Sequence, residues 1–145
     1  MSNRAGGVNR AGTAVRGGVR GTVGRAGSLE RAGRAELHRG RAVAAPTPEE
    51  RFVEAYRAAR AAAAALLQPG PRRRGPGDVW HRLAAEVPEL KEWAAALGAY
   101  SDLAAAVEDG LPRSVSARMA DDFLWAVGRF LDLVDERLGV LGPAA

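Results

Sequence analysis

Apolar side chains recur at spacings of three and four residues near the C-terminal end of the chain, which is the repeat of an amphipathic α-helix. The most regular series consists of Met119, Phe123, Val127, Phe130, Val134, Leu138 and Leu141. Ser114 or Ser116 can cap the start of this segment, and the series predicts the central core helix of the fold. Because Gly128 lowers helix stability, we expect another helix to pack closely against it.

A second helix has the clearest start signal in the sequence. Thr47 can cap it, Pro48 suits the first helical position, and Glu50 completes a capping box. Apolar residues then follow at helical spacing, namely Phe52, Tyr56, Ala59, Ala63 and Leu66. The alanines at 61–65 favour helix and let a neighbouring helix approach closely.

Two further helical segments complete the pattern. The first begins near Ser28 and carries a partial apolar stripe of Leu29, Ala32, Leu37 and Val43. The other begins near Asp78, is broken or kinked at Pro88 because proline lacks a backbone donor, and continues to Gly110. The sequence therefore predicts an all-α fold: an antiparallel helical bundle of four main helices, the third kinked at Pro88.

The N-terminal segment, residues 1–27, repeats an Arg-Ala-Gly theme and contains no acidic or aromatic residue. Glycine-rich backbone is costly to order, so we expect a disordered tail here, a folded bundle over residues 28–141 and a short C-terminal tail over 142–145. Three interpretations of the tail stay open. It is a solvated linker, a leader translated upstream of the true start codon, or an arginine–glycine tail that contacts phosphates.

Charge is distributed unevenly between the tail and the bundle. Residues 1–45 hold nine arginines against two glutamates, a net +7, whereas residues 46–145 hold 12 basic and 15 acidic residues, a net −3. We therefore expect any nucleic-acid binding to be weak, independent of sequence and confined to the tail. The tail arginines that would make these contacts include Arg16, Arg20 and Arg25, and a separate candidate phosphate contact is formed by Arg72, Arg73 and Arg74 in a Pro/Gly-rich loop.

Several classes of protein are disfavoured by composition. The absence of cysteine excludes disulfides and thiolate zinc sites, and with two histidines we expect no metal site and no cofactor. No apolar run approaches the length of a membrane span, and the charged N-terminus lacks the apolar stretch of a secretory signal. We expect a cytoplasmic protein.

The order of several short motifs resembles the HEPN superfamily (higher eukaryotes and prokaryotes nucleotide-binding domains), in particular a small stand-alone subgroup from actinobacteria. The matching stretches lie within residues 28–139 and are Pro48-Glu49-Glu50-Arg51-Phe52, Val79-Trp80, Pro88-Glu89-Leu90, Glu92-Trp93-Ala94, Ser116-Ala117-Arg118 and Asp121-Asp122. The resemblance implies an α-helical bundle that is often a homodimer. Many members are metal-independent ribonucleases, and others have lost catalysis and bind nucleotides, RNA or proteins.

Active members carry an arginine, four to six further residues and a histidine near the start of the last helix. Arg118 matches the arginine, but Phe123, Leu124 and Trp125 occupy the three places where the histidine would fall. Arg74 and His81 have the right spacing, although they lie in a loop and the third helix. His38 lies among arginines, where we expect an exposed side chain.

The sequence thus favours a non-catalytic HEPN-like module that binds a protein partner, a second copy of itself, or RNA. The alternative is a metal-independent ribonuclease with a displaced site that uses Arg118, or Arg74 with His81. We expect a homodimer, since Trp125 and Leu133 lie off the main apolar stripe of the last helix. A further partner could be encoded by a neighbouring gene.

Overall fold

The computed structural model describes residues 24–70 and 78–139 of the chain, and every regular element within these ranges is helical. Residues 24–44 are helical and are called the N-terminal helix below. The elements that follow are α2 (Pro48–Ala65), α3 (Asp78–Glu86), the 3₁₀ turn η1 (Pro88–Leu90), α4 (Lys91–Gly98), α5 (Ser101–Glu108) and α6 (Ala117–Leu138). The predicted all-α fold is confirmed.

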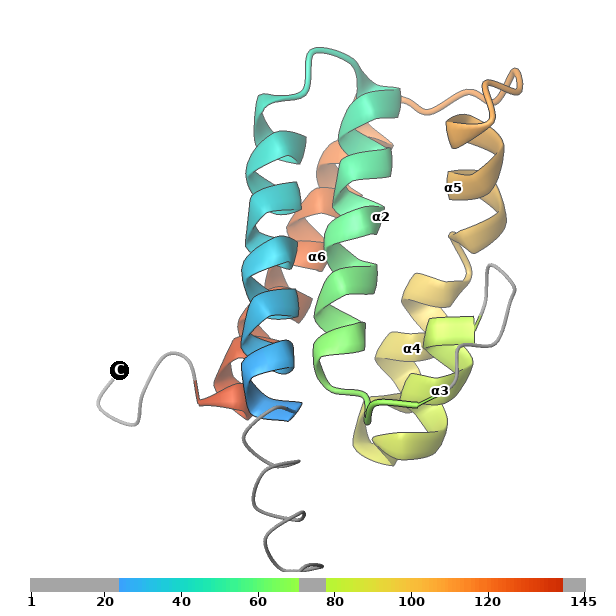
Figure 1. Ribbon diagram of the computed structural model, residues 1–145. Helices are drawn as coiled ribbons and strands as arrows, with labels where there is room; N and C mark the ends of the chain where they lie inside the picture. Colours follow the sequence, from blue (N-terminus) through green and yellow to red (C-terminus); the bar gives the residue numbers. More distant parts are fainter. Residues whose placement is uncertain (1–23, 71–77, 140–145) are drawn as a thin grey trace, which may run out of the picture.

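The long segments alternate in direction along the chain (Figure 1). The N-terminal helix and α2 lie side by side and antiparallel, α4 and α5 return in the opposite direction to α2, and α6 runs back again. Helices α2 and α6 make the most extensive contact of any two of these labelled elements. Their buried side chains, including Phe52 and Phe130, form the centre of the core.

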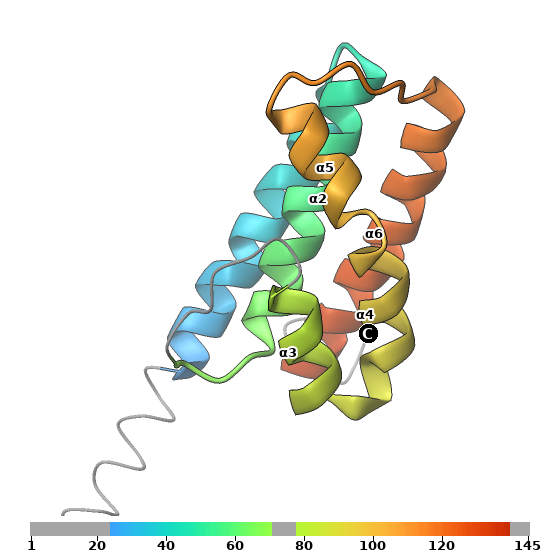
Figure 2. The same cartoon turned by 90° about the vertical axis from the view of Figure 1, so that its right-hand side faces the viewer.

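The segment predicted to be one kinked helix is instead a series of shorter helices. Helix α3 ends at Glu86, Val87 has the non-helical angles φ −129° and ψ 75°, and Pro88 opens the 3₁₀ turn. The chain reverses there, so that α3 and α4 pack against each other (Figure 2). Proline disfavours helical geometry in the preceding residue, and packing of the two short helices turns the expected kink into a reversal.

The predicted helix caps are present on the two long core helices. The Thr47 hydroxyl accepts a hydrogen bond from the Glu50 amide at 3.2 Å, and Ser116 accepts one from the Met119 amide at 3.1 Å. Helix α6 ends at Gly139, whose φ of +72° is left-handed, a conformation that glycine adopts without the steric cost of a side chain. These local signals confirm the predicted starts of α2 and α6.

The N-terminal helix differs from its prediction in two respects. It is already helical at residue 24, upstream of the expected cap at Ser28, because a formed helix extends readily through residues of good propensity such as Arg25 and Ala26. It also buries alanines rather than the predicted large residues. The buried residues are Ala32, Ala35 and Ala42, whereas the exposed ones are Leu29, Leu37 and Val43.

The apolar stripe of α6 lies in the core as predicted, with Phe123, Val127, Phe130 and Val134 buried. Gly128 receives the Arg39 side chain of the N-terminal helix, whose Nη2 lies 2.9 Å from the position that a Cβ would occupy. A long side chain of another helix therefore occupies the space that the missing Cβ of Gly128 leaves. Within the described residues, no helix combines the length and the apolar character that crossing a bilayer requires.

Candidate functional site

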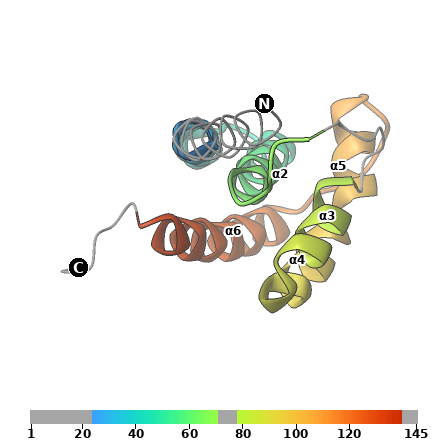
Figure 3. The ribbon, with the colours of Figure 1, turned by 60° about the horizontal axis from the view of Figure 1, so that its bottom comes forward.

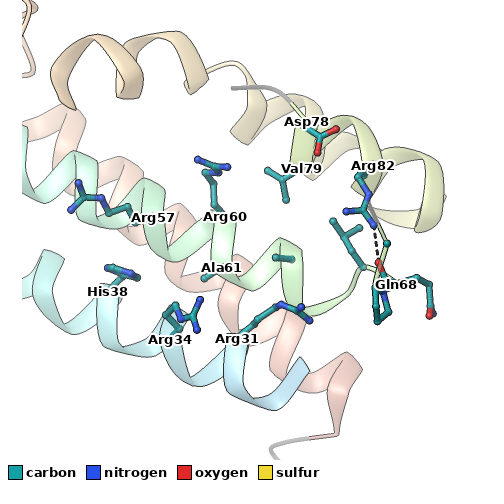
Figure 4. A pocket seen from close by; sticks show the side chains of 14 residues that line it. Arg31, Arg34, His38, Arg57, Arg60, Ala61, Gln68, Asp78, Val79 and Arg82 are labelled. Atoms are coloured by element: carbon teal, nitrogen blue, oxygen red, sulfur yellow. Dashed lines mark hydrogen bonds between the residues drawn. The ribbon is translucent and has the colours of Figure 1, made fainter. Parts of the chain in front are cut away.

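A groove of about 370 Å³ lies where the N-terminal helix, α2 and the start of α3 meet. Figure 4 shows its side chains, most of which are basic or small. The lining consists of Arg31, Arg34, His38, Arg57, Arg60, Ala61, Ala64, Leu67, Gln68, Pro69, Gly70, Asp78, Val79 and Arg82. Five arginines and one histidine therefore surround a hollow in which Asp78 is the single carboxylate among the described lining residues.

Helical spacing brings these basic side chains together. Arg31, Arg34 and His38 follow one another at intervals of three and four residues, which places them on one face of the N-terminal helix. Arg57 and Arg60 have the same spacing on α2. The alanines between and beyond them are small, and the cationic groups therefore dominate the surface of the groove.

Three of the arginines are held by neighbouring groups. Arg34 contacts Glu30 at 3.5 Å, and Arg57 contacts Glu54 at 2.9 Å. Arg82 donates to the backbone oxygen of Gln68 at 2.8 Å, the bond drawn in Figure 4. These contacts orient the guanidinium groups before any ligand arrives.

Arg31 and Arg60 are the other two arginines of the groove, and no contact of this kind holds them within the described residues. Neither makes an ion pair with another side chain in residues 24–70 or 78–139. Their guanidinium donors are thus available to an anion in the groove.

His38 and Glu54 form a polar pair at the edge of the groove. Nδ1 of His38 lies 2.7 Å from Oε2 of Glu54, and the two side chains are only 17% and 18% exposed. Burial of the Glu54 carboxyl opposes its ionisation, but the hydrogen bond to His38 and the charge of Arg57 outweigh burial and lower the pKa of Glu54. The expectation of an exposed His38 was wrong, because its ring packs between the N-terminal helix and α2 to reach this carboxylate.

The groove is suited to phosphate oxygens. A guanidinium group offers several donors in one plane and binds phosphate through paired hydrogen bonds. No aromatic side chain lines the groove among the described residues, so these side chains offer no platform for stacking a base. Within the same residues no cluster of three or more His, Asp or Glu side chains is placed to hold a metal ion.

The described residues predicted from the family pattern, Arg118 and His81, lie on different helices. Arg118 is 93% exposed at the start of α6, and its nearest acidic contact is Asp122 at 3.9 Å. His81 is exposed on α3 and does not line the groove. Arg25 is exposed on the N-terminal helix, while the other predicted contacts lie outside the described residues, namely Arg16, Arg20, Arg72, Arg73 and Arg74.

The three residues at the family's histidine position have different environments. Phe123 is buried and Leu124 is half-buried, but Trp125 is 67% exposed. Trp125 therefore lies off the buried stripe of α6, as the sequence indicated. Leu133 differs from its prediction, because it is half-buried and packs against the core.

The groove was missed because charge was counted by segment rather than by helix face. The spacing of Arg31, Arg34 and His38, repeated by Arg57 and Arg60, is visible in the sequence. The net negative charge of residues 46–145 concealed it, although several of those acidic residues, Glu54, Glu86 and Glu108 among them, pair with arginines of the groove.

One comparison with known proteins identifies a relative of this chain. The family model described as SAV_6107-like HEPN matches residues 42–135, which is more than half of the chain. The match begins near the end of the N-terminal helix and extends almost to the end of α6, so it includes α2 and α3 of the groove. No curated protein and no solved structure matches the chain.

Proposed function

The chain belongs to the SAV_6107-like HEPN family, and we propose that its bundle is a non-catalytic module that binds the phosphate backbone of single-stranded RNA. The observation that carries the proposal is the arrangement of five arginines and His38 around one groove. Arginine is the side chain best suited to paired contacts with phosphate. Binding through phosphates also accounts for a groove whose described lining contains no aromatic residue.

The arginines have two roles in this proposal. Arg31 and Arg60 contact phosphates directly, because no described carboxylate competes for them. Arg34, Arg57 and Arg82 are held by neighbouring groups, and carboxylates paired with them, such as Glu86 on Arg82, offset part of their charge, so these three arginines mainly shape the groove. Contacts of this kind carry no sequence information and weaken steeply with salt, since each neutralised phosphate releases counterions.

Binding at the groove departs from the sequence-based expectation that only the N-terminal tail contacts nucleic acid. Arg16 and Arg20 of that tail lie outside the described residues, whereas the groove arginines are fixed on helices. Side chains on a formed helix lose less conformational entropy on binding than those of a segment expected from its sequence to be disordered. We therefore assign the main contact to the groove.

The test measures fluorescence anisotropy of a labelled single-stranded RNA with the full chain and its variants. Arg31→Glu and Arg60→Glu should each reduce affinity about tenfold, a magnitude typical of losing one charged contact. Arg113→Glu is the matched control, because Arg113 is exposed before α6 and distant in sequence from the groove. Equal losses in all three variants would show that binding follows net charge and would contradict the proposal.

A ribonuclease is the second candidate function, and the His38–Glu54 pair favours it. A histidine held by a carboxylate beside arginines has the components of a general base and a phosphate-stabilising group. We retain the non-catalytic function because Arg118 has no histidine at the family's position. The measurement is turnover of a fluorescent RNA panel in chelator. Robust cleavage that His38→Ala or Arg57→Ala abolishes would establish the ribonuclease instead.

The exposed indole of Trp125 supports a further proposal, that the domain self-associates as a homodimer. A contiguous exposed apolar patch on a small domain tends to mark an interface, and exposed Val43 lines the same shallow hollow as Trp125. The groove residues and Trp125 lie on different faces, because Trp125 and its neighbours contribute nothing to the groove lining. Phosphate binding and self-association are therefore compatible in one molecule.

A further inference from the structure

A second hollow, of about 560 Å³, shares Arg57 with the groove. It is lined by the end of the N-terminal helix, the first half of α2 and the end of α5, and Figure 3 shows α2 between the other two helices. We call it the acidic hollow. Its lining holds four carboxylates and two guanidinium groups, those of Glu49, Glu50, Glu54, Glu108, Arg41 and Arg57.

The surface between these carboxylates is apolar. Val53 of α2 is buried, and Val107 of α5 is half-buried and packs against the core. Along α2, Val53 lies between Glu50 and Glu54 in sequence, and all three share one face of the helix. A carboxylate, an apolar group and a second carboxylate therefore follow one another over about one helical turn, roughly 5.4 Å.

Helix stability does not account for all of these acids. Glu49 and Glu50 lie in the first turn of α2, where carboxylates suit the positive end of the helix. Glu108 is the last residue of α5, where the backbone carbonyls make a carboxylate unfavourable. No three acidic side chains among the described residues are placed to hold a metal ion. The separated carboxylates therefore favour an extended cation over a compact one.

We propose that the acidic hollow binds a protonated aliphatic diamine, and that the bound diamine strengthens phosphate binding in the groove. The inference rests on the proposed function and adds a regulatory ligand to it. One ammonium group pairs with Glu50 at the start of α2, and the other pairs with Glu54 and Glu108 beside Arg57. The methylene chain between the two ammonium groups covers Val53.

Arg57 connects the two hollows. Its Nη1 lies 2.9 Å from Oε1 of Glu54, and its Nε lies 3.5 Å from Oε1 of Glu108. Both carboxylates line the acidic hollow, whereas the Arg57 side chain also lines the groove and is 45% exposed. A bound diamine competes with Arg57 for these carboxylates. The guanidinium group is then released to bind a phosphate in the groove.

The expected effect has the opposite sign to simple screening. Added cations weaken contacts between arginine and RNA, because they compete for the phosphates. Release of Arg57 strengthens one such contact by about twofold to fivefold, which corresponds to the free energy of one partly exposed ion pair. Because coupling between two sites is reciprocal, RNA should strengthen diamine binding by the same factor.

The test begins with equilibrium dialysis of the full chain against labelled 1,4-diaminobutane. Unlabelled 1,4-butanediol, which has the same carbon chain without charge, should not displace the label. Glu50→Gln should weaken diamine binding by about twofold to fivefold, because one ion pair is lost. Fluorescence anisotropy of labelled single-stranded RNA at constant ionic strength then measures the coupling, and the diamine should raise the affinity for RNA.

Two variants separate the release of Arg57 from general electrostatics. Glu108→Gln removes one carboxylate from Arg57, so it should raise RNA affinity about twofold to fivefold without diamine. Asp109→Asn makes the same change in charge one residue further along the chain. Asp109 is exposed and does not line the acidic hollow, so its replacement should have a smaller effect.

Each part of the proposal has an outcome that overturns it. Diamine binding that is absent, or unchanged in Glu50→Gln, would overturn the site. Equal binding of 1-aminobutane would overturn the diamine and identify a single cationic group, such as a lysine of a protein partner, as the occupant. Equal effects of Glu108→Gln and Asp109→Asn would overturn the link through Arg57. A chain that binds diamine but no RNA would overturn the proposed function and leave the diamine site standing.

Discussion

Nδ1 of His38 lies 2.7 Å from Oε2 of Glu54, and this bond joins the N-terminal helix to α2 at the edge of the groove. Glu54 also accepts from Arg57 at 2.9 Å through its other oxygen. One half-buried carboxylate therefore fixes both a histidine and an arginine of the proposed phosphate site. The positions of the His38 and Arg57 side chains in the groove therefore depend on Glu54.

Replacing His38 with alanine should destabilise the fold. The substitution removes one of the two hydrogen-bond partners of a largely buried carboxylate, and such losses cost about 1–3 kcal/mol. The measurement is the free energy of unfolding in urea. His81→Ala is the matched control, because His81 is exposed on α3 and should change stability by less than about 0.5 kcal/mol. Equal effects of the two substitutions would show that the pair contributes nothing.

A carboxylate cluster between the N-terminal helix and α6 should make stability depend on pH. Burial raises the pKa of Glu36 and of Asp135, the nearby Asp132 raises both further, and Arg39 opposes the shift. A raised pKa means that the fold favours the protonated acids. This contribution is present below their unfolded pKa values and is lost as pH rises through the folded ones.

Asp135→Asn should therefore stabilise the protein at neutral pH, by roughly 0.5 kcal/mol because the groups are partly solvated. The gain should shrink as pH falls through the titration range of carboxyl groups, where the wild-type acids take up protons. Thermal unfolding of both proteins across that range measures the difference. A gain that stays constant with pH would contradict the assignment to these acids.

The buried hydroxyl of Tyr56 links two other polar groups in the core. It donates to the Ser101 hydroxyl at 2.8 Å and accepts from the Trp80 indole at 3.0 Å. Tyr56→Phe leaves both partners buried and unpaired, so we expect a loss of about 1–3 kcal/mol in urea unfolding. Tyr100→Phe, at a half-buried position, should cost less. The opposite ranking would show that the hydroxyl network is not a source of stability.

Two glycines should respond in opposite ways to alanine. A Cβ at Gly98 would lie 3.1 Å from the Cβ of buried Trp80, which has little room to move, so Gly98→Ala should cost about 1–3 kcal/mol. A Cβ at Gly33 meets nothing within 4 Å, so Gly33→Ala should stabilise the N-terminal helix by up to about 1 kcal/mol. Melting temperatures that move in the same direction would contradict this account.

The long core helices were predictable because their signals are local. Thr47 and Ser116 mark helix starts by hydrogen bonds within one turn, and the stripe of α6 needs only a periodic sequence. The reversal after α3 was not predictable in the same way. Pro88 predicts that the helix ends there. Whether the chain then bends or reverses direction depends on the packing of α4 against α3.

The candidate site was less predictable than the fold. It combines residues from three helices, and only the tertiary arrangement places Arg31 near Arg60. His38 was misjudged because its partner Glu54 lies on the next helix. The family motif predicted a functional role for Arg118, whose side chain is exposed to solvent in the structure. Local sequence patterns do not predict which of these residues are buried or paired, because the neighbours of a side chain belong mainly to other helices.

The buried residues of the N-terminal helix are alanines, and α2 also buries alanines, at 55, 58, 59, 62 and 63. Such small side chains act as spacers of fixed thickness between two backbones. The distance between the arginines of one helix and those of the other is therefore fixed inside the protein, beneath the groove. One larger residue at Ala35 or Ala62 would widen the groove without altering any group that contacts a ligand. A substitution in the core would thus change the affinity for a chain of phosphates, although every residue on the surface of the groove would stay the same.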